Sequence, residues 1–144
     1  MKRGKRWLIA LLCLAAIGCG IFAASAMAGR RPYRELTAAD IQSATVLLAP
    51  PDTTLEIPDT GALAEYLSQV VIYGRDDSYT EYAGQAVRFM LHLADGSITD
   101  IVAYNPFLVI DGVGYRTKYE PCEALNRYAN ELLSSGEAAV IAGQ

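Results

Sequence analysis

Apolar and polar positions divide the chain into two parts of different kind. Residues 7–29 carry no charged side chain, and a short basic head lies just before them, formed by Lys2, Arg3, Lys5 and Arg6. Beyond residue 40 the apolar positions recur every second residue or at the i, i+3, i+4, i+7 spacing, which are the periods of strands and amphipathic helices. The pattern predicts an N-terminal hydrophobic helix followed by a domain that contains both strands and helices.

Strand patterns are clearest between residues 86 and 119. In 86–93, one face consists of Val87, Phe89, Leu91 and Leu93, and the other of Arg88, Met90 and His92. One face is therefore expected in the core, and the other faces solvent or a second layer. Further strands are predicted at 98–104, 107–110 and 113–119, with turns at Asp95-Gly96, Asn105-Pro106 and Asp111-Gly112.

Shorter elements precede this region. Strands predicted at 45–48 and 54–57 flank a turn at Pro50, Pro51 and Asp52, and a strand at 70–73 is ended by Gly74. Between them, Asp59 or Thr60 caps a short helix whose buried stripe is Leu63, Tyr66, Leu67 and Val70. A second helix begins near Pro121 and ends at Gly136, and its apolar stripe consists of Cys122, Leu125, Ala129, Leu132 and Leu133.

These elements predict an α+β fold with a mainly antiparallel sheet of about six or seven strands and two helices packed on it, preceded by the N-terminal hydrophobic helix. The domain is placed at residues 40–136, after a membrane anchor or signal peptide at 1–28 and a polar linker at 29–39. Residues 137–144 form a tail too short to interpret.

The leader allows three interpretations. Its uncharged run is 23 residues long, which favours a membrane anchor, because a spanning helix needs about 20 apolar residues and the apolar part of a cleaved signal is about 7 to 15. Ala26-Met27-Ala28 has the small-x-small form that a signal peptidase accepts before Gly29. Lipidation at Cys19 is the third interpretation, since a glycine and small residues precede it.

All three interpretations place the bulk of the chain on the same side of the membrane. Arg30, Arg31 and Arg34 nearly balance the basic head, but a short basic head followed at once by an apolar run is what export machinery recognises. We therefore expect a single-pass protein of the cell membrane with its domain outside the cytoplasm, or alternatively a secreted or lipid-anchored domain. The reverse orientation is the other alternative, because Arg30, Arg31 and Arg34 lie on the far flank.

Charge narrows the class of partner. All sixteen acidic residues lie beyond residue 28 together with eight of the twelve basic ones, so this remainder carries a net charge of −8. A surface of that sign repels nucleic acid phosphates, which argues against DNA or RNA as a partner. The expected partners are the membrane, through the N-terminal segment, and a protein or polymer of the cell envelope.

Cysteine and histidine are too few for several kinds of site. Cys13 and Cys19 lie in the leader, so Cys122 is the one thiol of the remainder and has no partner for an internal disulfide or a cysteine zinc site. Asp76, Asp77 and Glu81 are oxygen ligands suited to calcium, but their spacing lacks the alternation and central glycine of an EF-hand. No metal and no cofactor are predicted.

Cys122 has two interpretations. Near a helix N-terminus its thiol could have a lowered pKa and act as a nucleophile or redox group. It also belongs to the apolar stripe of its helix, which predicts burial against the sheet. We expect burial, and we predict no catalytic residue.

The candidate contact residues lie in two places. The polar loop after residue 75 carries Asp76, Asp77, Tyr79, Glu81 and Tyr82, and tyrosines on a loop are common recognition groups because they combine contact area with a polar tip. The simpler expectation for these two tyrosines is that they cover the edge of the core. Arg116 and Lys118 lie on the strand face opposite Tyr115 and could grip an anionic polymer or carboxylate. Cross-strand pairing with acids such as Asp100 is the simpler expectation for them.

The segments DDSYTEYAGQ and AYNPFLVIDGVGYRTKYEPCEALNRYAN, together with the basic and apolar leader, resemble a set of small exported or lipoprotein-like proteins of Gram-positive anaerobic bacteria. The resemblance implies a location in the cell envelope and a domain of unknown function, and it carries no catalytic residue. The expected function is a binding or interaction module without catalytic activity. The alternatives are a thiol-dependent hydrolase or redox protein using Cys122, and a structural accessory of an envelope complex.

Overall fold

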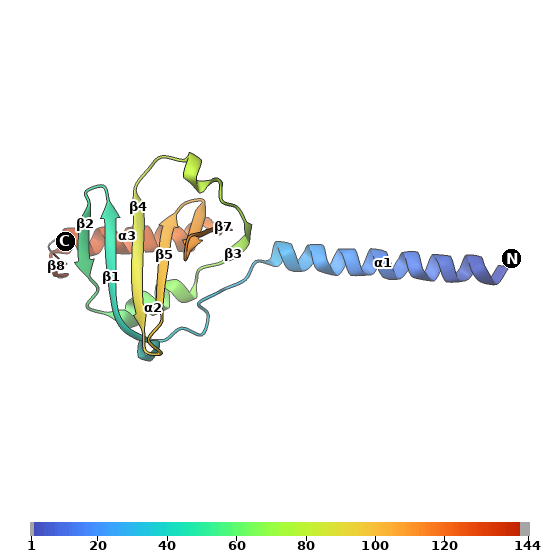
Figure 1. The fold of residues 1–144 in the computed structure, drawn as a ribbon, viewed down its shortest axis with the longest axis horizontal. Coiled ribbons are helices and arrows are strands. Elements are labelled where there is room, and N and C mark those ends of the chain that lie inside the picture. Colours follow the sequence, from blue (N-terminus) through green and yellow to red (C-terminus); the bar gives the residue numbers. More distant parts are fainter. Residues whose placement is uncertain (1, 142–144) are drawn as a thin grey trace.

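The computed structural model describes residues 2–141, which form one antiparallel sheet of eight strands and three α-helices (Figure 1). The helices are α1 (Lys2–Ala28), α2 (Thr60–Ser68) and α3 (Tyr119–Ser135), and two short 3-10 helices are η1 (Ala38–Asp40) and η2 (Ser78–Glu81). The strands are β1 (Ile41–Ala49), β2 (Thr53–Glu56), β3 (Ile72–Arg75), β4 (Ala86–Leu93), β5 (Ile98–Tyr104), β6 (Phe107–Ile110), β7 (Val113–Thr117) and β8 (Val140–Ile141).

The strand order across the sheet is β3-β7-β6-β5-β4-β1-β2-β8, and every neighbouring pair is antiparallel. Strands β4 to β7 follow one another as successive hairpins. Asp111 and Gly112 both have positive φ in the turn between β6 and β7, as expected of a two-residue hairpin turn. In this half of the sheet, strands that are neighbours in space are therefore also consecutive in the sequence.

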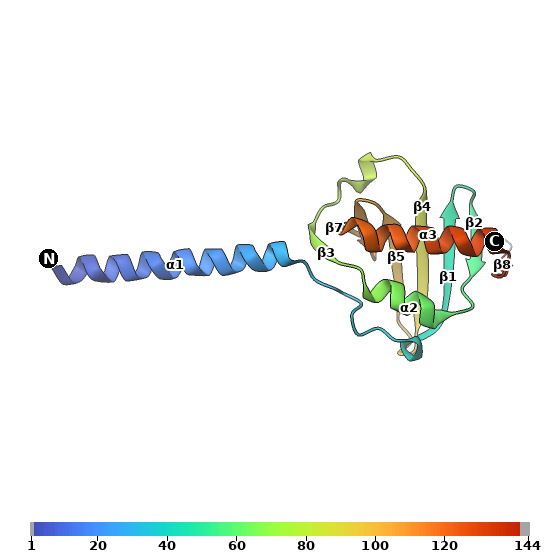
Figure 2. The ribbon, with the colours of Figure 1, turned by 180° about the vertical axis from the view of Figure 1, so that it is seen from behind.

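Helices α2 and α3 lie on the same face of the sheet, as the view from behind shows (Figure 2). That inner face holds the core, because the alternate residues of the central strands point toward the helices. Leu48, Phe89 and Ile101 are almost completely buried there. Arg88, Met90 and His92 point to the opposite, outer face, where they are exposed or half-buried.

The α+β class, the mainly antiparallel sheet and the N-terminal apolar helix are confirmed. The expected number of strands is wrong, because eight strands form instead of six or seven. The additional strand is β8, in the segment that the sequence left uninterpreted. It has only two residues, which pair with Thr54 and Leu55 of β2, so it is too short for a period to be detected.

Residues 29–36 are bound to the domain along their length. Arg30 and Ile72 exchange both backbone hydrogen bonds, at 2.8 and 2.9 Å. The Arg31 guanidinium donates twice to the Ser68 carbonyl at the end of α2, at 2.8 and 2.6 Å. Tyr33 and Leu36 pack against the edge of the core. Within the segment expected as a polar linker, Arg30 therefore forms one bridge to β3, and the residues that follow pack on the domain.

Helix α1 projects away from the domain (Figure 1). Its window Trp7–Ala24 has a mean hydropathy of 2.4, and none of it is buried against the rest of the chain. By length and composition this one helix is apolar enough to cross a membrane or to serve as a signal sequence.

Candidate functional site

The outer face of the sheet is partly covered by the loop of residues 76–84. Phe107 and Val109 point to this face and are nevertheless buried. The ring of Tyr82 meets Phe107 edge-on at 5.1 Å between centroids, and the ring of Tyr79 lies tilted at 6.4 Å. The loop thus forms a small apolar cluster of its own, separate from the main core beneath the helices.

Two adjacent aspartates fix the start of this loop. Asp76 accepts a hydrogen bond from Arg116 Nε at 2.6 Å, and it also accepts from the hydroxyl and the backbone N–H of Ser78. Asp77 accepts from the backbone N–H of Gly114 at 2.9 Å and from Arg75 Nε at 2.8 Å. Both aspartates therefore attach the loop to its supporting strands.

The same contacts shift the protonation of these groups. The hydrogen bonds from Ser78, followed by that from Arg116, lower the pKa of Asp76 to about 2. The pKa of Asp77 is also lowered, first by the Gly114 amide and then by Arg75. Both carboxylates are thus ionised at neutral pH and directed at partners within the chain.

Between the loop and the outer face of the sheet lies a groove of about 350 Å³. Its walls come from the loop and its floor from β4, β5 and β6. The Tyr82 side chain is accessible at its rim, with about half of the residue exposed (51%). The residues that line the groove are Tyr79, Thr80, Tyr82, Gly84, Ala86, Arg88, Asp100, Val102, Tyr104, Val109 and Gly112.

The polar centre of the groove is an ion pair between neighbouring strands. Arg88 Nε donates to Asp100 Oδ1 at 2.8 Å, and a second guanidinium nitrogen donates to Oδ2. A fork-to-fork pair of this kind has a fixed plane and orientation. About half of the Arg88 side chain (49%) and about a fifth of the Asp100 side chain (22%) remain exposed. The pair therefore offers both donors and acceptors to a ligand while adding no net charge.

A second hollow of about 250 Å³ adjoins the groove on the same face. It is lined by Thr45, Leu47, Thr54, Arg88 and Met90, from strands β1, β2 and β4. Arg88 lines both hollows. The residues that line the two hollows extend across the strands from β6 to β2, and we call this combined surface the outer-face track.

The structure separates the residues that the sequence proposed as contacts. Tyr79 and Tyr82 line the groove. The loop is attached to β7 through Asp76 and Asp77, and Arg116 is the partner of Asp76. The Arg116 guanidinium also lies 4.6 Å from the centre of the Phe107 ring. The two remaining candidates lie elsewhere on the surface: Glu81 is exposed at the end of η2, and Lys118 is exposed just before α3.

Arg116 pairs with an acid, as expected, but that acid is Asp76 and not the suggested Asp100. Asp100 pairs with Arg88 because β4 and β5 are neighbours and the two residues lie diagonally across them on one face. Arg116 lies on β7, two strands away from β5, and its partner comes from the loop folded over it.

The main residues missed by sequence reasoning are Arg88, Asp100 and Tyr104. The sequence does place these three residues on one face, because side chains alternate along β4 and β5 and all three lie opposite the buried apolar side chains. The turn at Asp95-Gly96 also brings these two strands together. What the pattern does not contain is the position of the loop, which turns an open sheet face into a groove.

Cys122 is completely buried on the inner face. Its thiol lies 3.6 Å from the Phe107 carbonyl, to which it donates. Burial raises the pKa of the Cys122 thiol to about 12. His92 points to the outer face, so the sheet separates the imidazole from the thiol.

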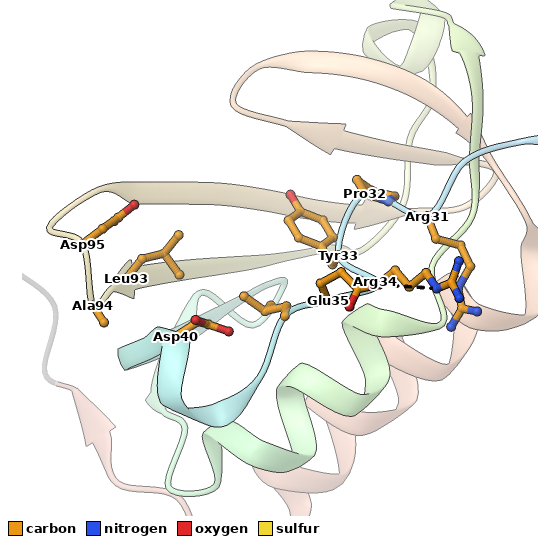
Figure 3. Close-up of a pocket in the computed structure, with 10 residues that line it drawn as sticks. Arg31, Pro32, Tyr33, Arg34, Glu35, Asp40, Leu93, Ala94 and Asp95 are labelled. Carbon is orange, nitrogen blue, oxygen red and sulfur yellow. Dashed lines mark ion pairs between the residues drawn. The ribbon is translucent and has the colours of Figure 1, made fainter.

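Another hollow, of about 420 Å³, lies between residues 31–36 and the turn from β4 to β5 (Figure 3). Its charged groups take part in local structure. Arg34 and Glu35 form an exposed ion pair, Asp40 accepts hydrogen bonds from Thr37, and Asp95 accepts from Ser97. Burial also raises the pKa of the Tyr33 phenol. These contacts explain the hollow as part of the packing of residues 31–36 against the domain.

Within residues 2–141, no group of three or more acidic, histidine or cysteine side chains is arranged to hold a metal ion. Comparison of the chain with protein families, with curated proteins and with solved structures found no match.

Proposed function

We propose that this chain is a binding module of the cell envelope that acts without catalysis. Helix α1 anchors it in the membrane, and the domain lies outside the cytoplasm, where it binds an envelope protein or polymer. Cleavage of the leader or lipidation at Cys19 would release or re-anchor the same domain on the same side. The basic head followed by the apolar helix, whose window Trp7–Ala24 is long and apolar enough to cross a membrane, supports this location.

The observation that carries the proposal is the groove beneath the loop. Binding sites are typically concave and combine aromatic and apolar walls with a few convergent polar groups. Here Tyr79, Tyr82 and Tyr104 supply the aromatic walls, and the Arg88–Asp100 pair supplies the polar centre. The loop that completes the groove is held by two aspartates and an aromatic cluster, so the site is formed before a partner arrives.

The features of Cys122 give the thiol-based alternative no support. A nucleophilic or redox cysteine requires an accessible thiolate with a lowered pKa. Cys122 is buried, its pKa is raised to about 12, and it lies on the opposite face of the sheet from the groove. The groove is lined by neither histidine nor cysteine.

Co-sedimentation with cell envelopes tests the proposal. The full chain in lipid nanodiscs is mixed with washed envelope fragments and centrifuged, so that only envelope-bound protein enters the pellet. Tyr82→Ala should abolish sedimentation, because it removes the exposed ring at the rim of the groove. Tyr119→Ala is the matched control, since Tyr119 is similarly exposed (60%) but lies at the start of α3. Equal sedimentation of both variants and the unmodified chain would contradict a binding role for the groove.

Location is tested on intact cells with an affinity tag at the C-terminus. An external protease should remove the tag without lysis if the domain lies outside the cytoplasm. Protection of the tag until the membrane is permeabilised would contradict the proposed orientation.

A further inference from the structure

We infer that the outer-face track binds an uncharged glycan chain laid across the strands. The inference rests on the proposed function, because it names the ligand of the same site. It is carried by the chemistry of the lining side chains, by the part of the sheet on which the track lies, and by the length of the track.

The aromatic walls suit sugar rings. Tyr79, Tyr82 and Tyr104 line one end of the track, and Tyr82 is half exposed. A tyrosine presents a flat apolar ring and a hydroxyl that donates or accepts a hydrogen bond. A pyranose has the complementary surface, with C–H groups on its ring faces and hydroxyl groups around its edge. Because Tyr82 packs edge-on against buried Phe107, its ring is held in place at the rim.

The polar centre suits an uncharged ligand with many hydroxyl groups. A guanidinium has five N–H donors, and Arg88 uses its Nε and one terminal nitrogen toward Asp100, so donors remain for a ligand. The Asp100 oxygens retain acceptor capacity. A hydroxyl both donates and accepts, so neighbouring sugar hydroxyls can engage both members of the pair. An anionic polymer would meet Asp100 and a domain of net charge −8, and is disfavoured.

The position of the track on a sheet face disfavours an extended peptide. Peptides that bind sheets usually add a strand at an exposed edge, where unpaired backbone groups are available. The strands under the track are paired on both sides: β4 with β1 and β5, and β5 with β4 and β6. A peptide lying across them would find side chains but no ladder for its own N–H and C=O groups. A glycan has no backbone amide ladder to satisfy and needs only side-chain partners.

The track is long enough for several sugar rings. It crosses five neighbouring strands, in the order β6, β5, β4, β1 and β2. With adjacent strands roughly 4.8 Å apart, its length is about 19 Å. Thr45 and Thr54 add hydroxyl groups at the far end, beyond Arg88. An oligosaccharide should therefore bind more tightly than its monosaccharide.

Calorimetric titration with defined glycans tests the inference. The full chain in nanodiscs, which avoids detergents with sugar head groups, is titrated with cellohexaose, chitohexaose, xylohexaose, mannohexaose and maltohexaose. We expect at least one of these to bind, and to bind more tightly than its monosaccharide. Tyr82→Ala and Arg88→Ala should each weaken that binding by about tenfold or more. Tyr119→Ala and Arg127→Ala, both exposed and away from the track, should leave it unchanged.

The results separate this inference from the proposed function. If none of the five glycans binds, or if binding is unaffected by both track variants, the glycan inference is overturned. Protease treatment of the envelopes provides a second readout: retained co-sedimentation supports a glycan, and its loss indicates a protein partner and overturns the inference. In that last case the Tyr82→Ala defect would still support a binding module, whereas equal sedimentation of all variants would overturn the proposed function itself.

Discussion

The ring of Tyr79 occupies the space that a side chain on Gly114 would need. A Cβ atom built on Gly114 would lie 2.6 Å from Tyr79 Cδ1, a distance that real Cβ contacts do not show, and it would also meet the Asp76 carbonyl. Gly114 is therefore required for space. Its backbone N–H also donates to Asp77, so the loop rests on this glycine through both its aspartate and its tyrosine.

Gly114→Ala should displace the loop and destabilise the domain by about 1–3 kcal/mol, the usual cost of forcing extra atoms into a packed site. Urea unfolding measures the loss. Gly74→Ala is the matched control, because Gly74 is also a strand glycine and a Cβ there would meet nothing within 4 Å. Its effect should stay within about 0.5 kcal/mol. Similar losses in both variants would show that the loop does not rest on Gly114.

The Asp76 carboxylate should make stability fall at acidic pH. Its folded pKa of about 2 lies below its ordinary value of 3.8, so the unfolded chain binds the proton more readily. The stabilisation is therefore complete above pH 3.8 and is lost as the pH falls through about 2. Unfolding by urea at about pH 7 and about pH 3 should show a smaller pH effect in Asp76→Asn than in the unmodified chain.

Glu81→Gln is the control for this measurement. It removes a carboxylate from the same loop, and within residues 2–141 the Glu81 side chain takes part in none of the hydrogen bonds or ion pairs. The pH effect should be the same in Glu81→Gln as in the unmodified chain. If Asp76→Asn and Glu81→Gln behave alike, the hydrogen bonds from Ser78 and Arg116 do not hold Asp76 ionised.

Cys122 should resist thiol reagents as long as the domain is folded. A pKa raised from 9.0 to about 12 lowers the thiolate fraction at neutral pH by roughly a thousandfold, and burial blocks the reagent as well. Reaction with iodoacetamide should therefore be at least about a hundredfold slower in the native chain than in urea. Cys13→Ser and Cys19→Ser are introduced so that Cys122 is the only thiol measured. Equal rates in native protein and urea would show that the thiol is accessible.

The strands were predictable where apolar and polar residues alternate over many consecutive positions. The alternation of Val87, Phe89 and Leu91 identified both β4 and its buried face, and the Asp111-Gly112 turn identified the hairpin of β6 and β7. Boundaries were less accurate. The last long strand was expected to reach Tyr119, but β7 ends at Thr117 and Tyr119 already begins α3. Pro121 still lies within the first turn of that helix, where it needs no backbone hydrogen bond.

The groove was only partly predictable, because its parts come together through contacts between residues far apart in the sequence. Tyr79 and Tyr82 were proposed as contact residues from their polar loop, and both line the groove. Their packing on Phe107 could not be predicted from the local sequence, because the pattern around Phe107 indicates only an ordinary buried strand residue. Likewise, Asp76 and Asp77 suggest ligands when read along the chain, and only the fold shows that Arg116 and Gly114 are their partners.

The attachment of residues 29–36 to the domain should be visible in hydrogen exchange. Arg30 and Ile72 share two backbone hydrogen bonds, and Gly29 approaches the residue before β3 so closely that a Cβ atom would lie 2.6 Å from Val71 Cγ1. The Arg30 amide should therefore exchange as slowly as that of Ile72 in the full chain in nanodiscs.

Gly29→Val should abolish this protection, because it introduces the clash and also strains a backbone with φ of +70°. Gly20→Val, where a Cβ meets nothing within 4 Å, should preserve it. Exchange of Arg30 at the rate of an unstructured peptide would instead mean that a flexible tether joins α1 to the domain, and would contradict the attachment of this segment.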